Sequence, residues 1–128
     1  MRLVLDTHVF IWLNEAPKKI SQQMITMLSS PENDLFLSLV SLWEMQIKIQ
    51  LGKLQLQDPL PDILATQQSE NNLQILPIHL DHIWALAELP NHHRDPFDRL
   101  LIAQLIATQV PIVSADAIFD RYPIQQLW

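Results

Sequence analysis

The chain has 128 residues, of which 48% are hydrophobic and 17% charged, a balance typical of one globular domain with a real core rather than of a disordered chain. It contains no cysteine, which excludes disulfides and thiolate metal sites, and no apolar run approaches the roughly 20 residues of a membrane span. The net charge of −6 argues against a protein that coats nucleic acid through a basic patch, but not against an enzyme that binds phosphates through metal ions.

The N-terminal half of the chain predicts two strands, each followed by a helix. Residues 2–6 and 35–40 contain short apolar runs typical of buried strands. The apolar segment 8–13 predicts a helix after the first strand, and Ser21 is a candidate N-cap for another. After the second strand, residues 41–44 fit a capping box, with Ser at the cap and Glu three residues later.

The middle of the chain is less regular. Gly52 is the only glycine, and we expect it to end the helix that follows the second strand, in a left-handed conformation. Residues 62–70 suggest a further helix, and residues 73–78 a short strand that Pro77 makes peripheral. Asp81 is a candidate cap for a helix that continues through residue 89.

The C-terminal third begins with a strong helix start. Asp95 is a capping acid and Pro96 takes the first helical position, so a helix is expected to about residue 108. Residues 111–113 form the last clear strand, and residues 117–120 suggest a turn of helix. Alternation of short strands with helices predicts an α/β fold with a mainly parallel central sheet, covered on both faces, in a single domain over residues 1–128.

Acids follow these strands and begin these helices. Asp6 and Asp116 come after the first and last strands, Glu44 lies one turn into its helix, and Asp95 and Asp98 lie in the first turn of theirs. In a parallel sheet the helices begin at the edge where the strands finish, so the four acids Asp6, Glu44, Asp98 and Asp116 are expected to converge, with Asp95 close by.

Such a cluster favours a cation. Two carboxylates about 5 Å apart repel by roughly 3 kcal/mol at an effective dielectric near 20, and all-oxygen ligands suit Mg²⁺ or Mn²⁺. The chemistry that fits is phosphodiester hydrolysis. Each acid also has a structural interpretation: Glu44 as a capping-box residue, Asp95 as an N-cap, and Asp98 as a partner of the helix dipole.

The histidines and tryptophans are weaker signals. The five histidines show no zinc-binding spacing, and His8, although next to Asp6, is expected to be a core or surface residue. The four tryptophans lie mostly in apolar helix patterns, which favours core or interface positions over base-stacking platforms.

Four stretches together resemble the PIN-domain ribonucleases, specifically VapC-type toxins of bacterial toxin–antitoxin pairs: residues 3–8, 38–44, 95–104 and 112–116. The resemblance covers nearly the whole chain. It implies a PIN-like three-layer α/β/α sandwich and an acidic quartet at Asp6, Glu44, Asp98 and Asp116 that binds Mg²⁺ or Mn²⁺, with Asp95 as a further ligand or a cap. It also implies that Ser114, Arg94 and Arg99 contact substrate, although Arg99 is equally suited to a structural ion pair.

The resemblance further implies an RNA substrate, a cognate antitoxin protein and a homodimer, in a soluble protein of the cytoplasm without membrane attachment. Two alternatives come from another class: a non-catalytic PIN-like binding module, and a receiver-like signalling domain that binds Mg²⁺. A receiver needs paired acids after its first strand and a lysine after a late strand. Here one acid follows the first strand and no lysine follows Lys53, which disfavours it.

Overall fold

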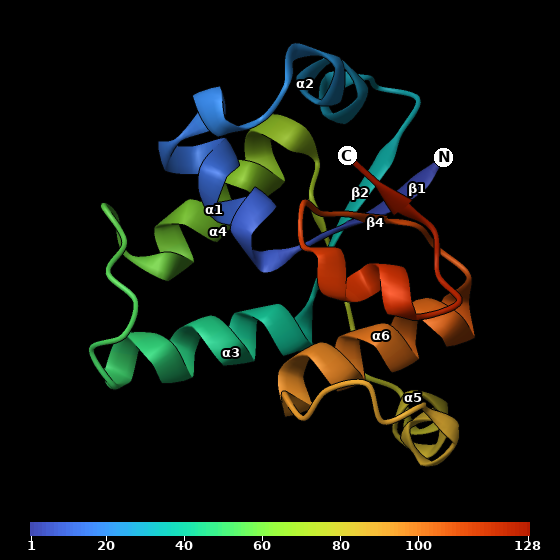
Figure 1. Cartoon of the computed structure of the whole chain (residues 1–128). Coiled ribbons are helices and arrows are strands. Elements are labelled where there is room, and N and C mark those ends of the chain that lie inside the picture. Colours follow the sequence, from blue (N-terminus) through green and yellow to red (C-terminus); the bar gives the residue numbers. More distant parts are fainter.

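The computed structural model describes residues 1–128 and contains one parallel sheet of five strands, in the order β3-β2-β1-β4-β5. Neighbouring strands all pair in parallel, with Leu5 opposite Leu37 on one side and Val113 on the other. β1 is therefore central (Figure 1). The strands are β1 Arg2–Leu5, β2 Asp34–Ser38, β3 Gln74–Leu76, β4 Ile112–Val113 and β5 Gln126–Leu127.

Six α-helices and three short 3₁₀ helices connect and flank the strands. The α-helices are α1 Thr7–Glu15, α2 Gln22–Ser29, α3 Leu39–Gln50, α4 Leu60–Asn71, α5 Leu80–Ala85 and α6 Pro96–Thr108. The 3₁₀ helices are η1 Pro17–Lys19, η2 Leu86–Glu88 and η3 Ala117–Arg121. No helix is both long and apolar enough to cross a membrane.

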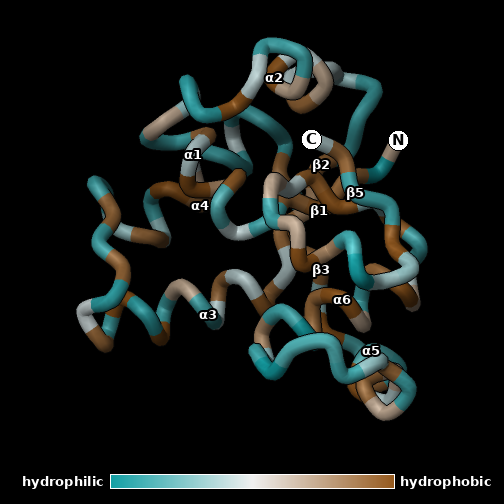
Figure 2. The backbone as a smooth tube through the Cα atoms, viewed as in Figure 1, coloured by the Kyte–Doolittle hydropathy of each residue, from teal (hydrophilic) through white to brown (hydrophobic).

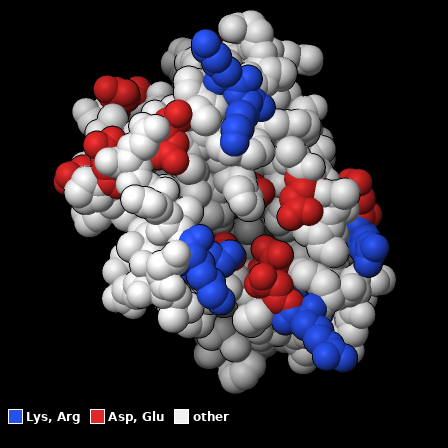
Figure 3. Space-filling view, turned by 60° about the vertical axis from the view of Figure 1, so that its left-hand side comes forward, with Lys and Arg blue, Asp and Glu red and all other residues white.

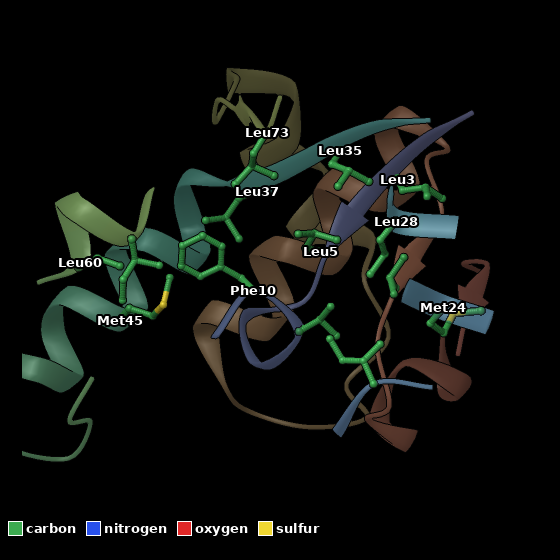
Figure 4. Packing of buried hydrophobic residues seen from close by; sticks show 14 residues of the cluster. Leu3, Leu5, Phe10, Met24, Leu28, Leu35, Leu37, Met45, Leu60 and Leu73 are labelled. Atoms are coloured by element: carbon green, nitrogen blue, oxygen red, sulfur yellow. The ribbon is translucent and has the colours of Figure 1, made fainter. Parts of the chain in front are cut away.

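Two hydrophobic clusters cover the two faces of the sheet, because successive side chains of a strand point to opposite faces. Leu3 and Leu5 of β1 join the cluster that includes residues of α1, α2 and α4, whereas Val4 joins the cluster with α6 and η3. Figure 4 shows Phe10 of α1 among the leucines of the first cluster. Figure 2 shows the apolar residues concentrated along the strands. This arrangement confirms the predicted α/β sandwich.

The second strand ends earlier than predicted, and the helix that follows begins earlier. β2 stops at Ser38, whose hydroxyl accepts a hydrogen bond from the Val40 backbone and so caps α3. The predicted capping box at Ser41 is therefore wrong, and the Ser41 hydroxyl is buried without a partner. Ser38 takes the cap position instead of Ser41, and its hydroxyl also donates to the buried Gln104 side chain of α6. Glu44 thus lies in the second turn of α3, free of a capping role.

Gly52 confirms its predicted place after α3. Its φ is +72°, and the backbone N–H groups of Gly52 and Lys53 donate to the carbonyls of Ile49 and Lys48. These two bonds form the motif that commonly ends a helix at a left-handed glycine.

Other boundaries differ by a few residues. α1 starts at Thr7 because the Asp6 carboxylate caps it, and the helix predicted over residues 62–70 spans Leu60–Asn71. Asp81 is not a cap: α5 is capped at His79, whose backbone N–H donates to the ring of His82. The helix predicted to continue through residue 89 changes at residue 86 into the 3₁₀ helix η2.

Candidate active site

The five acids lie where strands end and helices begin, on one edge of the sheet. Asp6 follows β1 and Asp116 follows β4, the strand that pairs directly with β1. Asp95 and Asp98 begin α6, and Glu44 points from α3, which packs against α6. Figure 3 shows acidic side chains around a hollow on this face, with basic side chains at its margins.

Asp6 is held from both sides. It is buried, one carboxylate oxygen (Oδ1) accepts the Thr7 backbone N–H at 2.8 Å, and the other (Oδ2) accepts the Ser114 hydroxyl at 2.8 Å. Burial raises the pKa of Asp6 above its usual value, while these hydrogen bonds and the nearby His8 act in the opposite direction. The carboxylate therefore has one fixed orientation at the end of the central strand.

Ser114 joins Asp6 to Asp116. The Ser114 oxygen that donates to Asp6 also accepts the Asp116 backbone N–H at 3.0 Å, and Asp116 caps η3 through the Ile118 backbone N–H. Gln126 of β5 donates to the carbonyls of Ser114 and Asp116, each at 2.8 Å. The last strand therefore fixes the loop that carries the final acid. Nothing in the sequence pattern indicated Gln126.

Asp98 shows that the acids act on one another. Burial is the largest cause that raises its pKa, followed by the negative charges of Asp95, Glu44, Asp6 and Asp116, and together they bring it to about 7. This electrostatic coupling brings together the four acids that the sequence pattern selected, with Asp95 as the fifth.

Asp95 caps α6 as predicted. Its Oδ1 accepts the backbone N–H groups of Phe97 and Asp98, at 2.9 and 3.1 Å. Because one oxygen makes both bonds, the cap leaves the second oxygen without a bond to the helix. Capping and a place beside the other acids are therefore compatible roles for this residue.

Glu44 is paired with a lysine that the sequence analysis missed. Its carboxylate is buried, accepts the Thr7 hydroxyl at 3.3 Å, and accepts the Lys48 ammonium at 2.8 Å. The hydrogen bond to Glu44 is the largest cause that raises the pKa of Lys48, and the charges of Asp95 and Asp98 add to it. The i,i+4 spacing of Glu44 and Lys48 on one helix face was the available signal.

The loop before α6 places a histidine beside Asp98. The Nε2 atom of His93 is buried without a hydrogen bond and lies 3.7 Å from an Asp98 oxygen, while Nδ1 lies 2.6 Å from the Tyr122 hydroxyl. Burial lowers the pKa of His93, which favours its neutral form. Arg99 donates to the carbonyls of Leu89, Pro90 and His93 and so fixes this loop, whereas Arg94 is exposed.

The ligands at this site suit a hard divalent cation. Five carboxylates and the Ser114 hydroxyl offer only oxygen atoms, which Mg²⁺ and Mn²⁺ prefer, and the repulsion at Asp98 is what a cation would relieve. No three His, Asp or Glu side chains already form a ready metal-binding group. Glu44 bonds to Lys48 instead, so metal binding requires these side chains to rearrange.

Solved structures with the same fold cover nearly the whole chain. The structure of VapBC2 from Rickettsia felis bound to a promoter DNA fragment matches with 18% identity and a TM-score of 0.75, over 99% of this chain and 98% of that chain. VapBC-1 from Haemophilus influenzae matches with 16% identity and a TM-score of 0.71, over 99% and 97%. VapBC-5 from Mycobacterium tuberculosis matches with 21% identity and a TM-score of 0.58, over 98% of this chain and 97% of that chain.

At these identities the likeness shows a shared fold. The comparison with curated proteins gives no match. The family model described as PIN domain matches residues 3–125. The chain therefore belongs to the PIN domain family.

Proposed function

We propose that the chain is a metal-dependent endoribonuclease of the cytoplasm, and the toxin of a toxin–antitoxin pair. The observation that supports the proposal most is the position of Asp6 and Asp116 after two adjacent parallel strands, joined through the Ser114 hydroxyl. Burial, and after it the charges of the four other acids, raises the pKa of Asp98 to about 7. An acid so placed favours a bound cation over solvent, and phosphodiester hydrolysis is chemistry that such a cation assists.

Asp6, Glu44, Asp98 and Asp116 would hold Mg²⁺ or Mn²⁺, with Asp95 beside them. Bound there, the metal supplies Lewis-acid chemistry, which polarises the phosphoryl oxygen and makes an attacking water more acidic. Asp6 is kept in orientation by the Ser114 hydroxyl, and this hydroxyl also fixes the backbone at Asp116.

Substrate phosphates need cationic groups at the rim of the acids. Arg94 is exposed on the loop before α6 and is the better placed of the two predicted arginines, because Arg99 uses its guanidinium on loop carbonyls. Lys48 becomes a third candidate once a metal ion replaces its ammonium beside Glu44. Arg94 is therefore the substrate contact that we propose first. Ser114 is buried and bonded to Asp6 and Asp116, and Arg99 is bonded to loop carbonyls, so each would have to leave these bonds to contact substrate as the resemblance implies.

The proposed partners are an antitoxin protein and a second copy of the chain. Four solved structures of this fold carry VapBC names, and a further one is described as a toxin–antitoxin complex from Klebsiella pneumoniae, at 15% identity and a TM-score of 0.60. An exposed groove of about 510 Å³ between α3 and α4 suits an apolar partner segment. Its apolar lining is Leu39, Leu42, Trp43, Leu60, Leu64 and Ile78.

The test is cleavage of bacterial tRNA and ribosomal RNA by the purified chain in Mg²⁺, with and without EDTA. We expect cleavage that EDTA abolishes, with 5′-phosphate and 3′-hydroxyl ends. Asp6→Asn and Asp116→Asn should each reduce the rate at least 100-fold, because each removes a charged oxygen from the metal site. Asp58→Asn, in an exposed loop, is the matched control and should cleave normally.

Two results would contradict the proposal. Undiminished cleavage by Asp6→Asn protein would exclude this mechanism. Absence of cleavage of any RNA by wild-type protein that binds Mn²⁺ would favour the non-catalytic PIN-like module.

In cells, expression of the wild-type chain alone should stop growth, and expression of the Asp116→Asn chain should not.

A further inference from the structure

A row of aromatic rings starts beside the acids and runs along α1 to the C-terminus. The ring of His8 lies 5.9 Å from that of Trp12, and the ring of Trp12 lies 5.9 Å from that of Trp128. The two pairs are tilted by 43° and 53°, so neither pair is stacked face to face. Neither ring of a pair therefore covers the whole face of the other.

The rings at the two ends of the row are open to solvent. The His8 side chain is 67% exposed and Trp128 is 47% exposed, while Trp12 is half-buried. Trp12 packs against the first hydrophobic cluster, which holds its ring in place. Large exposed aromatic rings in a row are unusual on a surface that serves no contact.

A pocket joins the rings directly to the catalytic acids. It has a volume of about 260 Å³, and its lining is Asp6, His8, Trp12, Ala115 and Asp116. This is below the roughly 300–1,000 Å³ of sites for drug-sized ligands, and it suits one flat ring rather than a larger molecule. A ligand in it would contact two aromatic rings on one side and two of the proposed metal-binding acids on the other.

Positive charge also lies beside the rings. The Lys19 ammonium lies 5.6 Å from the centre of the Trp12 ring, and Lys18 is also exposed on η1. A strand of nucleic acid that had one phosphate at the metal site could therefore place a base in the pocket and direct its next phosphate toward these lysines. Stacking on aromatic rings between charged contacts is how single strands are commonly bound.

We propose that His8 and Trp12 form a nucleobase subsite, in which an unpaired base of the RNA stacks beside the phosphate that is cleaved. The inference rests on the proposed ribonuclease function and adds a contact to the substrate base, which must be unpaired because a base inside a helix is not free to stack. It replaces the expectation that Trp12 serves only in the core or an interface. Trp128 extends the same surface for a second base.

The test compares two probes of equal charge, a fluorescein-labelled RNA of six adenylates and a hexamer of abasic ribose phosphates. Affinity is measured by fluorescence anisotropy with Mg²⁺ in an Asp98→Asn background, which suppresses cleavage. Trp12→Leu should weaken binding of the adenylate probe about tenfold and change binding of the abasic probe less than twofold. Trp12→Phe should retain most of the affinity, and His8→Ala should lose about threefold.

Trp84→Leu is the matched control, because Trp84 is 66% exposed on α5 and outside the pocket, and it should bind both probes normally. The subsite is excluded if Trp12→Leu binds the adenylate probe within twofold of the background protein, or if it weakens both probes equally. If circular dichroism shows that Trp12→Leu is unfolded, His8→Ala replaces it. The subsite is then excluded if His8→Ala binds the adenylate probe within twofold of the background protein or weakens both probes equally. Cleavage by the wild-type chain, assayed in parallel, separates failure of the subsite from failure of the ribonuclease proposal.

Discussion

Asp98 is the residue at which the structure adds most to the sequence. Its position three residues after Asp95, in the first turn of a helix, was predictable, and so was its direction toward the other acids. Its raised pKa was not, because its burial and the charges of Glu44, Asp6 and Asp116 beside it arise only in the folded chain. A carboxyl with a pKa of about 7 destabilises the metal-free fold when it is ionised, and a bound cation would relieve this destabilisation.

This destabilisation predicts a pH-dependent stability difference. Asp98 has a pKa of 3.8 when unfolded and about 7 when folded. Below pH 3.8 it is protonated in both states. Between pH 3.8 and 7 the unfolded chain releases this proton more readily, so the contribution of Asp98 to stability falls as pH rises, and above 7 it stays constant. Asp98→Asn, which is always neutral, should therefore gain stability relative to the wild type as pH rises from 4.5 to 8.

Urea unfolding in EDTA at pH 4.5, 6 and 8 measures this difference. The side chain is 28% exposed and water screens part of the repulsion, so we expect a gain of about 2 kcal/mol at pH 8. Saturating Mg²⁺ should make the wild type more stable than Asp98→Asn, because the wild type binds the ion more tightly. Asp58→Asn should follow the wild type at every pH. A pH-independent difference for Asp98→Asn would show that neither burial nor the other acids raise the pKa of Asp98.

At the scale of elements, the sequence located every α-helix and four of the five strands, but not all of their ends, and it missed the 3₁₀ helix η1. Ser38 and Ser41 are both plausible caps for α3 in the sequence. Tertiary contacts decide between them. β2 pairs with β1 as far as Leu37 and with β3 as far as Ser38, and the Ser38 hydroxyl donates to Gln104 of α6. β5 was missed because two residues at a chain end give no periodic signal.

The true start of α3 gives Glu44 and Lys48 a shared role. Both project from one face of the helix, and the Lys48 ammonium bonds to Glu44 and is attracted by Asp95 and Asp98. The lysine thus acts as the counter-ion of the site while no metal is bound. Lys48→Met should bind Mn²⁺ about three- to tenfold more tightly, because no ammonium must first be displaced.

Isothermal titration with MnCl₂ measures this change. The same variant should unfold at lower urea concentration in EDTA, because Glu44 is left buried and without its partner. Lys53→Met, an exposed lysine in the turn after α3, should leave both quantities as in the wild type. Weaker Mn²⁺ binding by Lys48→Met would show instead that the lysine organises the site for the metal.

For the whole molecule, the strand order explains why acids so distant in sequence meet. β1 and β4 are neighbours at the centre of the sheet, so Asp6 and Asp116, which are 110 positions apart, share one hydroxyl of Ser114. The sequence predicted that the acids share one edge of the sheet, since parallel strands end together. It did not give the strand order or the aromatic row, because these depend on contacts between distant segments.

The central claim is that these acids form one metal site. Crystals of the wild-type chain soaked in MnCl₂, with an anomalous difference map, test it most directly. We predict one or two manganese peaks at the edge of the sheet, within about 2.6 Å of carboxylate oxygens of Asp6 and Asp116 and contacted by Asp98 or Glu44. A map without a peak among these acids, at Mn²⁺ concentrations that saturate the protein in solution, would contradict the account.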